Sequence, residues 1–200
     1  MGGKLMRSDT LPERTYMITT RPRTDSEVAR HRPAMKPSVR RTQELVAAAP
    51  ERTSVFLVSG QIQLSIKPSA ITTILGSCVA VCIWEPVLGI GGATHYLLPD
   101  RVSAEKGSLR FGTLAIEHLI SKLLDAGCER ENMKARVFGG ASIFAGFKSI
   151  DQQLGTKNCE IAFRVLHENG IPVVESDTGG SRGRKLIFHT DTGDAWVKLL

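Results

Sequence analysis

The fold of this 200-residue chain is decided by residues 78–97, which read CVAVCIWEPVLGIGGATHYL. The first seven of these residues are apolar throughout, a pattern that favours a buried central strand. Glu85-Pro86-Val87-Leu88-Gly89 then predicts a turn, because Pro86 favours a bend and Gly89 tolerates unusual dihedral angles. A second extended run at residues 90–97 completes an antiparallel hairpin.

This hairpin gives two reactive side chains a reason to meet. Cys78 lies eight residues before Pro86 and His95 nine residues after it, so the hairpin is expected to place them roughly opposite each other. A thiol beside an imidazole is a candidate nucleophile and base. The pair favours a hydrolytic or acyl-transfer enzyme, provided that the register does not slip by one residue and turn one side chain to the other face.

The segments around the hairpin predict an α/β fold with a mostly antiparallel sheet. Extended runs precede it at residues 55–58, 61–66 and 71–75, and others are expected at 172–175, 185–189 and 195–199. Helical spacing of apolar residues predicts one helix over residues 114–124 and another from about 156 to 169. The strands do not alternate regularly with helices, which argues against a doubly wound nucleotide-binding fold.

The positive charge of the chain belongs to its N-terminal part. Residues 1–53 contain eleven Lys or Arg against six Asp or Glu, whereas the rest of the chain is nearly neutral. This part is rich in proline and poor in large apolar residues, so residues 1–52 are predicted to form a mostly disordered basic extension, with a short helix near 42–49. Residues 53–200 are then the single folded domain. The basic extension raises the idea of a nucleic-acid partner, but no basic stripe with interleaved aromatic residues follows, so no nucleic acid is expected.

The sequence predicts a cytoplasmic protein without direct membrane insertion. No stretch has the eighteen or more apolar residues of a membrane span, and the N-terminus lacks the apolar region of a secretory signal. The four cysteines are too few and too scattered for a disulfide framework and are expected to be reduced thiols. Cys82 follows Cys78 by four residues, but a single pair at this spacing is a poor zinc signature, so no metal site is predicted.

Five ordered blocks of sequence resemble the CheD family, the chemoreceptor glutamine deamidases of bacterial chemotaxis. The resemblance covers about residues 54–198 and rests on LGSCVAV at 75–81, GGATHYLLP at 91–99, RFG at 110–112, FGGA at 138–141, and GG at 179–180 with GRK at 183–185. Several motifs in one order are far more specific than any single glycine motif.

The resemblance implies both an activity and a fold. Members are cysteine hydrolases that convert particular receptor glutamines to glutamates, releasing ammonia through a thioester, with no cofactor. Their fold is a layered α-β-β sandwich similar to the catalytic domain of cytotoxic necrotizing factor toxins. The implied partners are methyl-accepting chemotaxis receptors as substrates and a CheC-type phosphatase.

The resemblance also assigns the site residues. The nucleophile maps to Cys78, the histidine to His95, and the threonine six residues before the cysteine to Thr72. Thr73 stays open as an alternative to Thr72, because adjacent strand residues face opposite sides of a sheet.

Backbone N–H groups around Gly76, Ser77 and Cys78 are expected to bind the oxyanion of the reaction. Gly139 and Gly140 suggest a close approach of the backbone that helps to shape the substrate cleft, although packing alone would explain them.

Each of these residues also has a structural interpretation. A cysteine on an apolar strand is more often a small core residue, a buried histidine more often a structural one, and a strand threonine an ordinary strand residue. A competing functional hypothesis is a mainly non-catalytic module that binds the receptor or the phosphatase. Such a module would not need Cys78 and His95 together.

Overall fold

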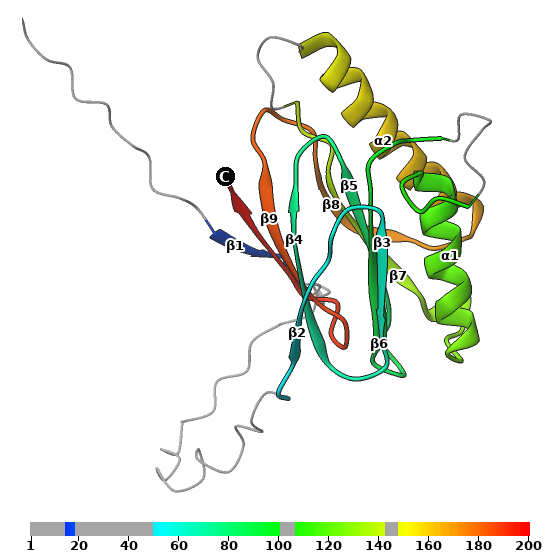
Figure 1. Cartoon of the computed structure of the whole chain (residues 1–200). Coiled ribbons are helices and arrows are strands. Elements are labelled where there is room, and N and C mark those ends of the chain that lie inside the picture. The colour runs from blue at the N-terminus through cyan, green and yellow to red at the C-terminus, as the bar shows by residue number, and fades with distance from the viewer. Residues whose placement is uncertain (1–14, 19–49, 101–106, 143–147) are drawn as a thin grey trace, which may run out of the picture.

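The computed structural model describes residues 15–18, 50–100, 107–142 and 148–200, which form a mixed α/β structure of two sheets and two helices (Figure 1). The elements in chain order are β1 (Thr15–Ile18), β2 (Thr53–Phe56), β3 (Gln61–Ser65), β4 (Ser69–Leu75), β5 (Val79–Glu85), β6 (Ile90–Tyr96), α1 (Gly112–Asp125), the short 3-10 helix η2 (Arg130–Asn132), β7 (Lys134–Gly139), α2 (Lys148–Glu168), β8 (Val173–Thr178), β9 (Arg184–His189) and β10 (Ala195–Leu199).

Two five-stranded sheets lie face to face. We call the sheet with strand order β3-β6-β5-β7-β8 the central sheet and the one with order β1-β10-β9-β4-β2 the outer sheet. The pairs β2–β4 and β7–β8 are parallel, and the other six pairings are antiparallel. Each sheet is therefore mixed, with one parallel pair at an edge.

The molecule has three layers, because α1 and α2 cover one face of the central sheet and the outer sheet covers the other (Figure 1). Strand β5 shows why the hairpin segment is apolar throughout. Its alternate residues enter two different cores: Val79, Val81 and Ile83 face the helices, whereas Ala80, Cys82 and Trp84 face the outer sheet. All seven residues of β5 are buried. We call the packing between the central sheet and the helices the helix-side core, and the packing between the two sheets the inter-sheet core.

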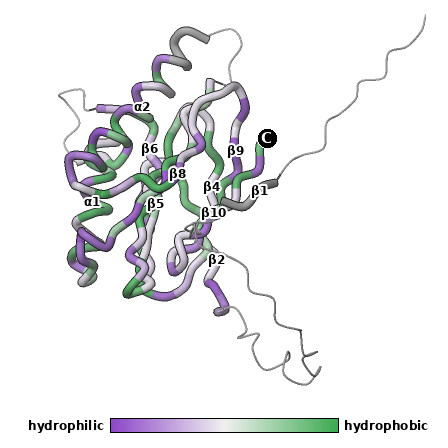
Figure 2. The backbone as a smooth tube through the Cα atoms, turned by 180° about the vertical axis from the view of Figure 1, so that it is seen from behind, coloured by the Kyte–Doolittle hydropathy of each residue, from purple (hydrophilic) through white to green (hydrophobic). Residues whose placement is uncertain are grey.

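Helix α1 covers the central sheet with one apolar face, as the spacing of its residues predicts. Its buried residues recur at helical intervals, and hydrophobic and hydrophilic colours alternate along it in Figure 2. The helix extends one or two residues beyond each predicted end. Helix α2 is longer than predicted, since it begins at Lys148 and not near residue 156.

The prediction omitted one strand of the central sheet. Strand β7 lies between β5 and β8, so it is an interior strand. Its sequence, KARVFG, interrupts the apolar pattern with Lys134 and Arg136, of which Lys134 is exposed and Arg136 is buried between the sheets. Because of these two charged residues, the sequence pattern does not indicate a strand here, although β7 is buried on both faces.

Part of the N-terminal extension is ordered. Residues 15–18 form β1, which pairs antiparallel with β10 at the edge of the outer sheet, so the extension that is predicted to be mostly disordered contains one strand. The open edge of β10 supplies the backbone groups with which this segment pairs. The expected helix at 42–49 lies outside the described residues, and the domain boundary at residues 52 and 53 stays a prediction.

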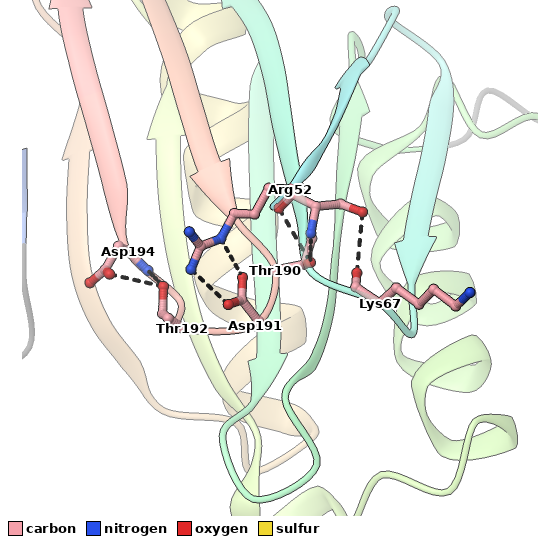
Figure 3. A network of polar contacts seen from close by, with 7 residues as sticks. Arg52, Lys67, Thr190, Asp191, Thr192 and Asp194 are labelled. Carbon is pink, nitrogen blue, oxygen red and sulfur yellow. Dashed lines mark hydrogen bonds and ion pairs between the residues drawn. The ribbon is translucent and has the colours of Figure 1, made fainter. Parts of the chain in front are cut away.

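Arg52 is bound to the folded domain. Its guanidinium group donates from Nε and Nη2 to the two carboxylate oxygens of Asp191, at 2.8 and 2.7 Å (Figure 3). Nearby, the Ser69 amide donates to the hydroxyl of Thr190, and the Ser69 hydroxyl donates to the Lys67 carbonyl. The bidentate pair joins the segment before β2 to the turn between β9 and β10.

Trp84 is a large, buried member of the inter-sheet core. Only 2% of its surface is exposed. Its ring meets Phe188 of the outer sheet edge to face, with centroids 6.2 Å apart, and the Arg136 guanidinium carbon lies 5.4 Å from the ring centroid. Gly193 lies so close that a Cβ there would fall 2.1 Å from the Trp84 ring. These contacts fix the separation of the two sheets.

In the described part of the chain, no helix is long and apolar enough to cross a membrane.

Candidate active site

The hairpin β5–β6 places Cys78 and His95 on the same face of the central sheet. His95 pairs directly with Ala80, and Cys78 precedes Ala80 by two residues. Directly paired residues share a face and alternate residues return to it, so both side chains point into the inter-sheet layer. The Cys78 side chain packs against the inter-sheet core. The two residues are thus diagonal neighbours, because Cys78 lies two residues before Ala80, the direct partner of His95.

The His95 imidazole is oriented by a threonine hydroxyl. Thr73 Oγ1 lies 2.9 Å from His95 Nδ1 and donates its proton to the Leu57 carbonyl oxygen at 2.8 Å. A hydroxyl has one proton to donate, so Thr73 accepts the proton of Nδ1. In the neutral ring the lone pair is then on Nε2, which is the arrangement that a general base requires.

The second ring nitrogen of His95 is buried and unpaired. Only 5% of the residue is exposed, and Nε2 has no hydrogen-bond partner among the described residues. Burial lowers the pKa of His95, and the nearby Leu57 carbonyl only partly opposes this effect. The ring is therefore neutral at pH 7 and has an unused lone pair in the layer that Cys78 also faces.

The hydroxyl beside His95 Nδ1 belongs to Thr73 and not to Thr72, the predicted residue. Thr73 is 1% exposed and shares the inward face of β4 with Ile71 and Leu75, whereas Thr72 points to the opposite face. Thr72 contributes its backbone instead, since its carbonyl accepts the Leu57 amide at 2.8 Å. The prediction that Thr72 contacts the ring is corrected to Thr73, which is the alternative that strand alternation left open.

The Cys78 thiol is half-buried and close to backbone amides. The Gly76 N–H donates to its sulfur at 3.4 Å. Burial raises the pKa of the Cys78 thiol, and the amides of Gly76 and of Cys78 itself oppose that rise. The group is therefore a thiol at neutral pH and needs a base to become a nucleophile.

Three donors hold the turn that carries Cys78. The carbonyl oxygens of Gly76, Ser77 and Cys78 accept hydrogen bonds from the amide of Ala141 at 2.8 Å, the side-chain amide of Asn158 at 3.0 Å and the amide of Gly140 at 2.9 Å, in that order. Every carbonyl of the turn is thus fixed by a group from elsewhere in the chain.

Gly139 and Gly140, the pair predicted to shape a cleft, pack against the turn that carries Cys78. Gly139 has a φ of +114°, and a Cβ there would fall 2.2 Å from the Cys78 carbonyl oxygen. Gly140 has a φ of +68°, and a Cβ there would fall 2.4 Å from the sulfur of Cys159. Arg184 adds a donor to the Gly139 carbonyl at 3.2 Å. Both glycines therefore support the position of Cys78; a role in shaping the cleft stays a prediction.

Asn158 is the residue of this site that sequence reasoning missed. It is fully buried in α2, and its side-chain amide binds the carbonyls of Ser77 and Leu97. A signal was present, because Asn158 precedes Ala162 by four residues and Val165 by seven, so it lies on the apolar stripe of the helix. A polar residue on such a stripe needs a buried partner.

Among the described residues, no group of three or more His, Cys, Asp or Glu side chains is arranged to hold a metal ion. The polar groups around Cys78 and His95 are a hydroxyl, a carboxamide and backbone amides. This set suits acyl transfer from a neutral carbonyl compound to a thiol.

Comparison with known proteins identifies relatives that match about three quarters of the chain. A family model described as "CheD chemotactic sensory transduction" matches residues 97–199. A "Probable chemoreceptor glutamine deamidase CheD 1" from Anaeromyxobacter dehalogenans is 49% identical over 149 residues, which cover 74% of this chain and 86% of that protein. A "Probable chemoreceptor glutamine deamidase CheD" from Sulfurimonas denitrificans is 39% identical over 145 residues, covering 72% of this chain and 93% of that protein.

The matches differ in what they include. The match to the family model begins two residues after His95. A matched stretch of 149 residues, in contrast, cannot fit into a 200-residue chain without including positions 78 and 95. Among solved structures, the hypothetical protein YfiH from Bacillus licheniformis superposes with a TM-score of 0.40 at 12% identity, covering 70% of this chain and 61% of that one.

Proposed function

Because this chain belongs to the CheD family, we propose that it is a chemoreceptor glutamine deamidase, which hydrolyses receptor glutamine side chains to glutamate and releases ammonia. One observation supports the proposal independently of the family. Cys78, just before β5, and a neutral His95 on β6, oriented by a threonine, face the same layer. A protein that only binds a partner has no need of this pair.

The first half of the proposed reaction forms a thioester. His95 Nε2 takes the proton of the Cys78 thiol, and the thiolate attacks the carboxamide carbon of the glutamine. A C–S bond forms while the carbonyl π electrons move to oxygen, giving a tetrahedral oxyanion that the backbone amides at residues 76–78 stabilise. The C–N bond then breaks, and the imidazolium returns its proton to the leaving nitrogen, which departs as ammonia.

The second half releases glutamate. His95, neutral again, takes a proton from a water molecule, and the resulting hydroxide adds to the thioester carbon. Collapse of this second tetrahedral intermediate breaks the C–S bond, and the sulfur recovers the proton from His95. The sum of the steps is carboxamide plus water giving carboxylic acid plus ammonia, with the enzyme unchanged. Thr73 keeps the same ring nitrogen available in both halves.

The proposal also includes the substrates, the second partner, the cellular compartment, the fold similarity and the oxyanion site. The substrates are methyl-accepting chemotaxis receptors, and a CheC-type phosphatase is a second partner. The protein acts in the cytoplasm. The layered α-β-β arrangement is similar to the catalytic domain of cytotoxic necrotizing factor toxins, and the amides of Gly76, Ser77 and Cys78 form the oxyanion site.

Replacement of the nucleophile tests the function. Cys78→Ala and Cys78→Ser are each expected to abolish deamidation of a purified receptor fragment, because neither can form the thioester. Mass spectrometry follows the reaction, since each conversion of glutamine to glutamate adds about one mass unit. The thermal unfolding midpoint should change little, because Cys78 is only partly buried.

Cys82→Ala is the matched control. Cys82 lies on β5, four residues after Cys78 and facing the same layer, but it is fully buried, and burial raises its pKa far above the ordinary thiol value. This variant is expected to lose some stability and to keep its turnover per folded molecule. Turnover retained by Cys78→Ala would refute the proposed nucleophile. A wild-type protein that binds the receptor fragment and converts no glutamine would instead support the non-catalytic module.

A further inference from the structure

One buried side chain connects the turn that carries Cys78 to the strand that carries His95. Asn158 is 0% exposed, and its Nδ2 donates to the Ser77 carbonyl at 3.0 Å and to the Leu97 carbonyl at 2.9 Å. Its own backbone carbonyl accepts the Tyr96 hydroxyl at 2.6 Å. The amide must have this orientation, because a rotated amide would direct its oxygen at two carbonyl oxygens.

The bond to Ser77 sets the direction of the Cys78 amide. The Ser77 carbonyl and the Cys78 N–H belong to one planar trans peptide unit, so they point in opposite directions. When Asn158 holds the carbonyl towards α2, the Cys78 N–H must point away from α2. That N–H has no hydrogen bond to another backbone carbonyl of the described residues. No backbone carbonyl of the described residues thus competes with the oxygen of a reacting carbonyl compound for this N–H.

The bond to Leu97 spans the end of the hairpin at which direct pairing stops. The last pair of the β5–β6 ladder is Val79 with Tyr96. Beyond it the strands separate, since the Leu97 amide donates to the Arg110 carbonyl and the Cys78 carbonyl accepts the Gly140 amide. Asn158 replaces the missing ladder bonds with one side chain that binds both strands. The position of the Cys78 turn relative to the end of β6 therefore depends on it.

We propose that Asn158 is a positioning residue, which directs the Cys78 N–H at the substrate oxygen and fixes the spacing between the nucleophile and His95. This inference rests on the proposed deamidase function. Asn158 does not touch the reacting atoms; it acts through the Ser77 and Leu97 carbonyls. Its Oδ1 atom is buried without a partner among the described residues, so stability alone is a poor reason for an asparagine here.

Two variants with different volumes test the proposal. Asn158→Leu keeps the size of the side chain and removes both donors, and Asn158→Ala removes the side chain beyond Cβ. Each is expected to lower kcat for a receptor fragment about tenfold to a hundredfold, because a small misplacement of reacting groups has an effect of this size. KM should stay within about threefold, because the oxyanion interaction forms only in the transition state.

A second measurement separates positioning from folding. The rate at which iodoacetamide alkylates Cys78 is measured against pH in the folded protein. In both variants the midpoint of this profile should move to higher pH, because a displaced peptide unit stabilises the thiolate less. A purely structural residue would lower the thermal unfolding midpoint without moving the profile. Neither variant introduces a charge that would shift the profile by itself.

Asn169→Ala is the matched control, since Asn169 follows the last residue of α2 and its amide also donates to a backbone carbonyl, that of Val165 at 2.8 Å. It should leave kcat and the alkylation profile unchanged.

If Asn158→Leu and Asn158→Ala keep wild-type kcat per folded molecule while Cys78→Ala is inactive, the positioning role is wrong and the deamidase function stands. If the wild-type protein itself converts no glutamine, the function fails, and an unshifted alkylation profile would then overturn the positioning role as well.

Discussion

The two ends of the hairpin β5–β6 have opposite properties. At the turn, the buried Glu85 carboxylate accepts the amides of Val87 and Leu88 at 3.0 and 2.7 Å, and the Glu85 carbonyl accepts the Gly89 amide at 3.0 Å. At the open end, His95 Nε2 has no partner among the described residues, and the Cys78 sulfur accepts a long hydrogen bond from the Gly76 amide at 3.4 Å. One end satisfies its polar groups internally, and at the other end His95 Nε2 has no partner among the described residues.

This difference shows how one supersecondary unit serves folding and chemistry separately. The turn end is held by hydrogen bonds between residues that are at most four positions apart in the sequence. The open end is held by residues from distant parts of the chain, namely Ala141, Gly140 and Asn158. Substitutions at the two ends should therefore affect different measurements: activity at the open end and stability at the turn.

The largest effect is expected from His95→Gln. Glutamine can still donate to Thr73, but it cannot accept the thiol proton, so kcat should fall by about 10² to 10⁴. The thermal unfolding midpoint should change little, because Thr73 keeps its bond to the Leu57 carbonyl. Deamidation of a receptor fragment is measured alongside thermal unfolding. Activity within tenfold of the wild type would remove His95 from the reaction.

A smaller effect is expected from Thr73→Val, which has nearly the same shape without the hydroxyl. The ring loses the group that fixes its tautomer, so kcat should fall about tenfold to a hundredfold. The lost hydrogen bond should also lower the free energy of unfolding by about 1 kcal/mol. Thr72→Val is the paired control and should change kcat less than about twofold. If Thr72→Val lowered kcat more than Thr73→Val does, Thr72 and not Thr73 would be the residue that orients the ring.

The smallest effect on activity is expected from Glu85→Gln at the turn. One carboxylate oxygen is replaced by an amide nitrogen, which cannot accept a backbone N–H, so the free energy of unfolding should fall by about 1–2 kcal/mol. Urea denaturation measures this change. Turnover per folded molecule should equal that of the wild type, and a loss of turnover in the folded variant would show that the two ends of the hairpin are coupled.

Local patterns predicted the hairpin and its two reactive residues. The apolar run before Pro86 and the extended run after Gly89 are β5 and β6, and the turn lies between them. The offset of two residues between Cys78 and the direct partner of His95 depends on the strand register, which the turn geometry sets and the apolar pattern alone does not.

Long-range features were harder to predict. Thr72 and Thr73 are the same residue type at adjacent positions, and only the packing of β4 on the central sheet decides which one faces His95. Asn158 lies 80 residues beyond Cys78 in the sequence, and β7 carries charges that a periodicity argument counts against a buried strand. In each case the deciding contact is tertiary, so a local window of sequence does not contain it.

The placement of Trp84 gives the protein an internal optical reporter. The chain has two tryptophans. Trp84 is enclosed between the sheets on the strand that begins next to Cys78, whereas Trp196 is partly exposed and contacts His189 with the rings tilted by 57° and their centroids 4.4 Å apart. Emission from an enclosed indole shifts to longer wavelength when water reaches it. Intrinsic fluorescence can therefore monitor whether the two sheets remain joined while a chemical signal follows the thiol in the same cuvette.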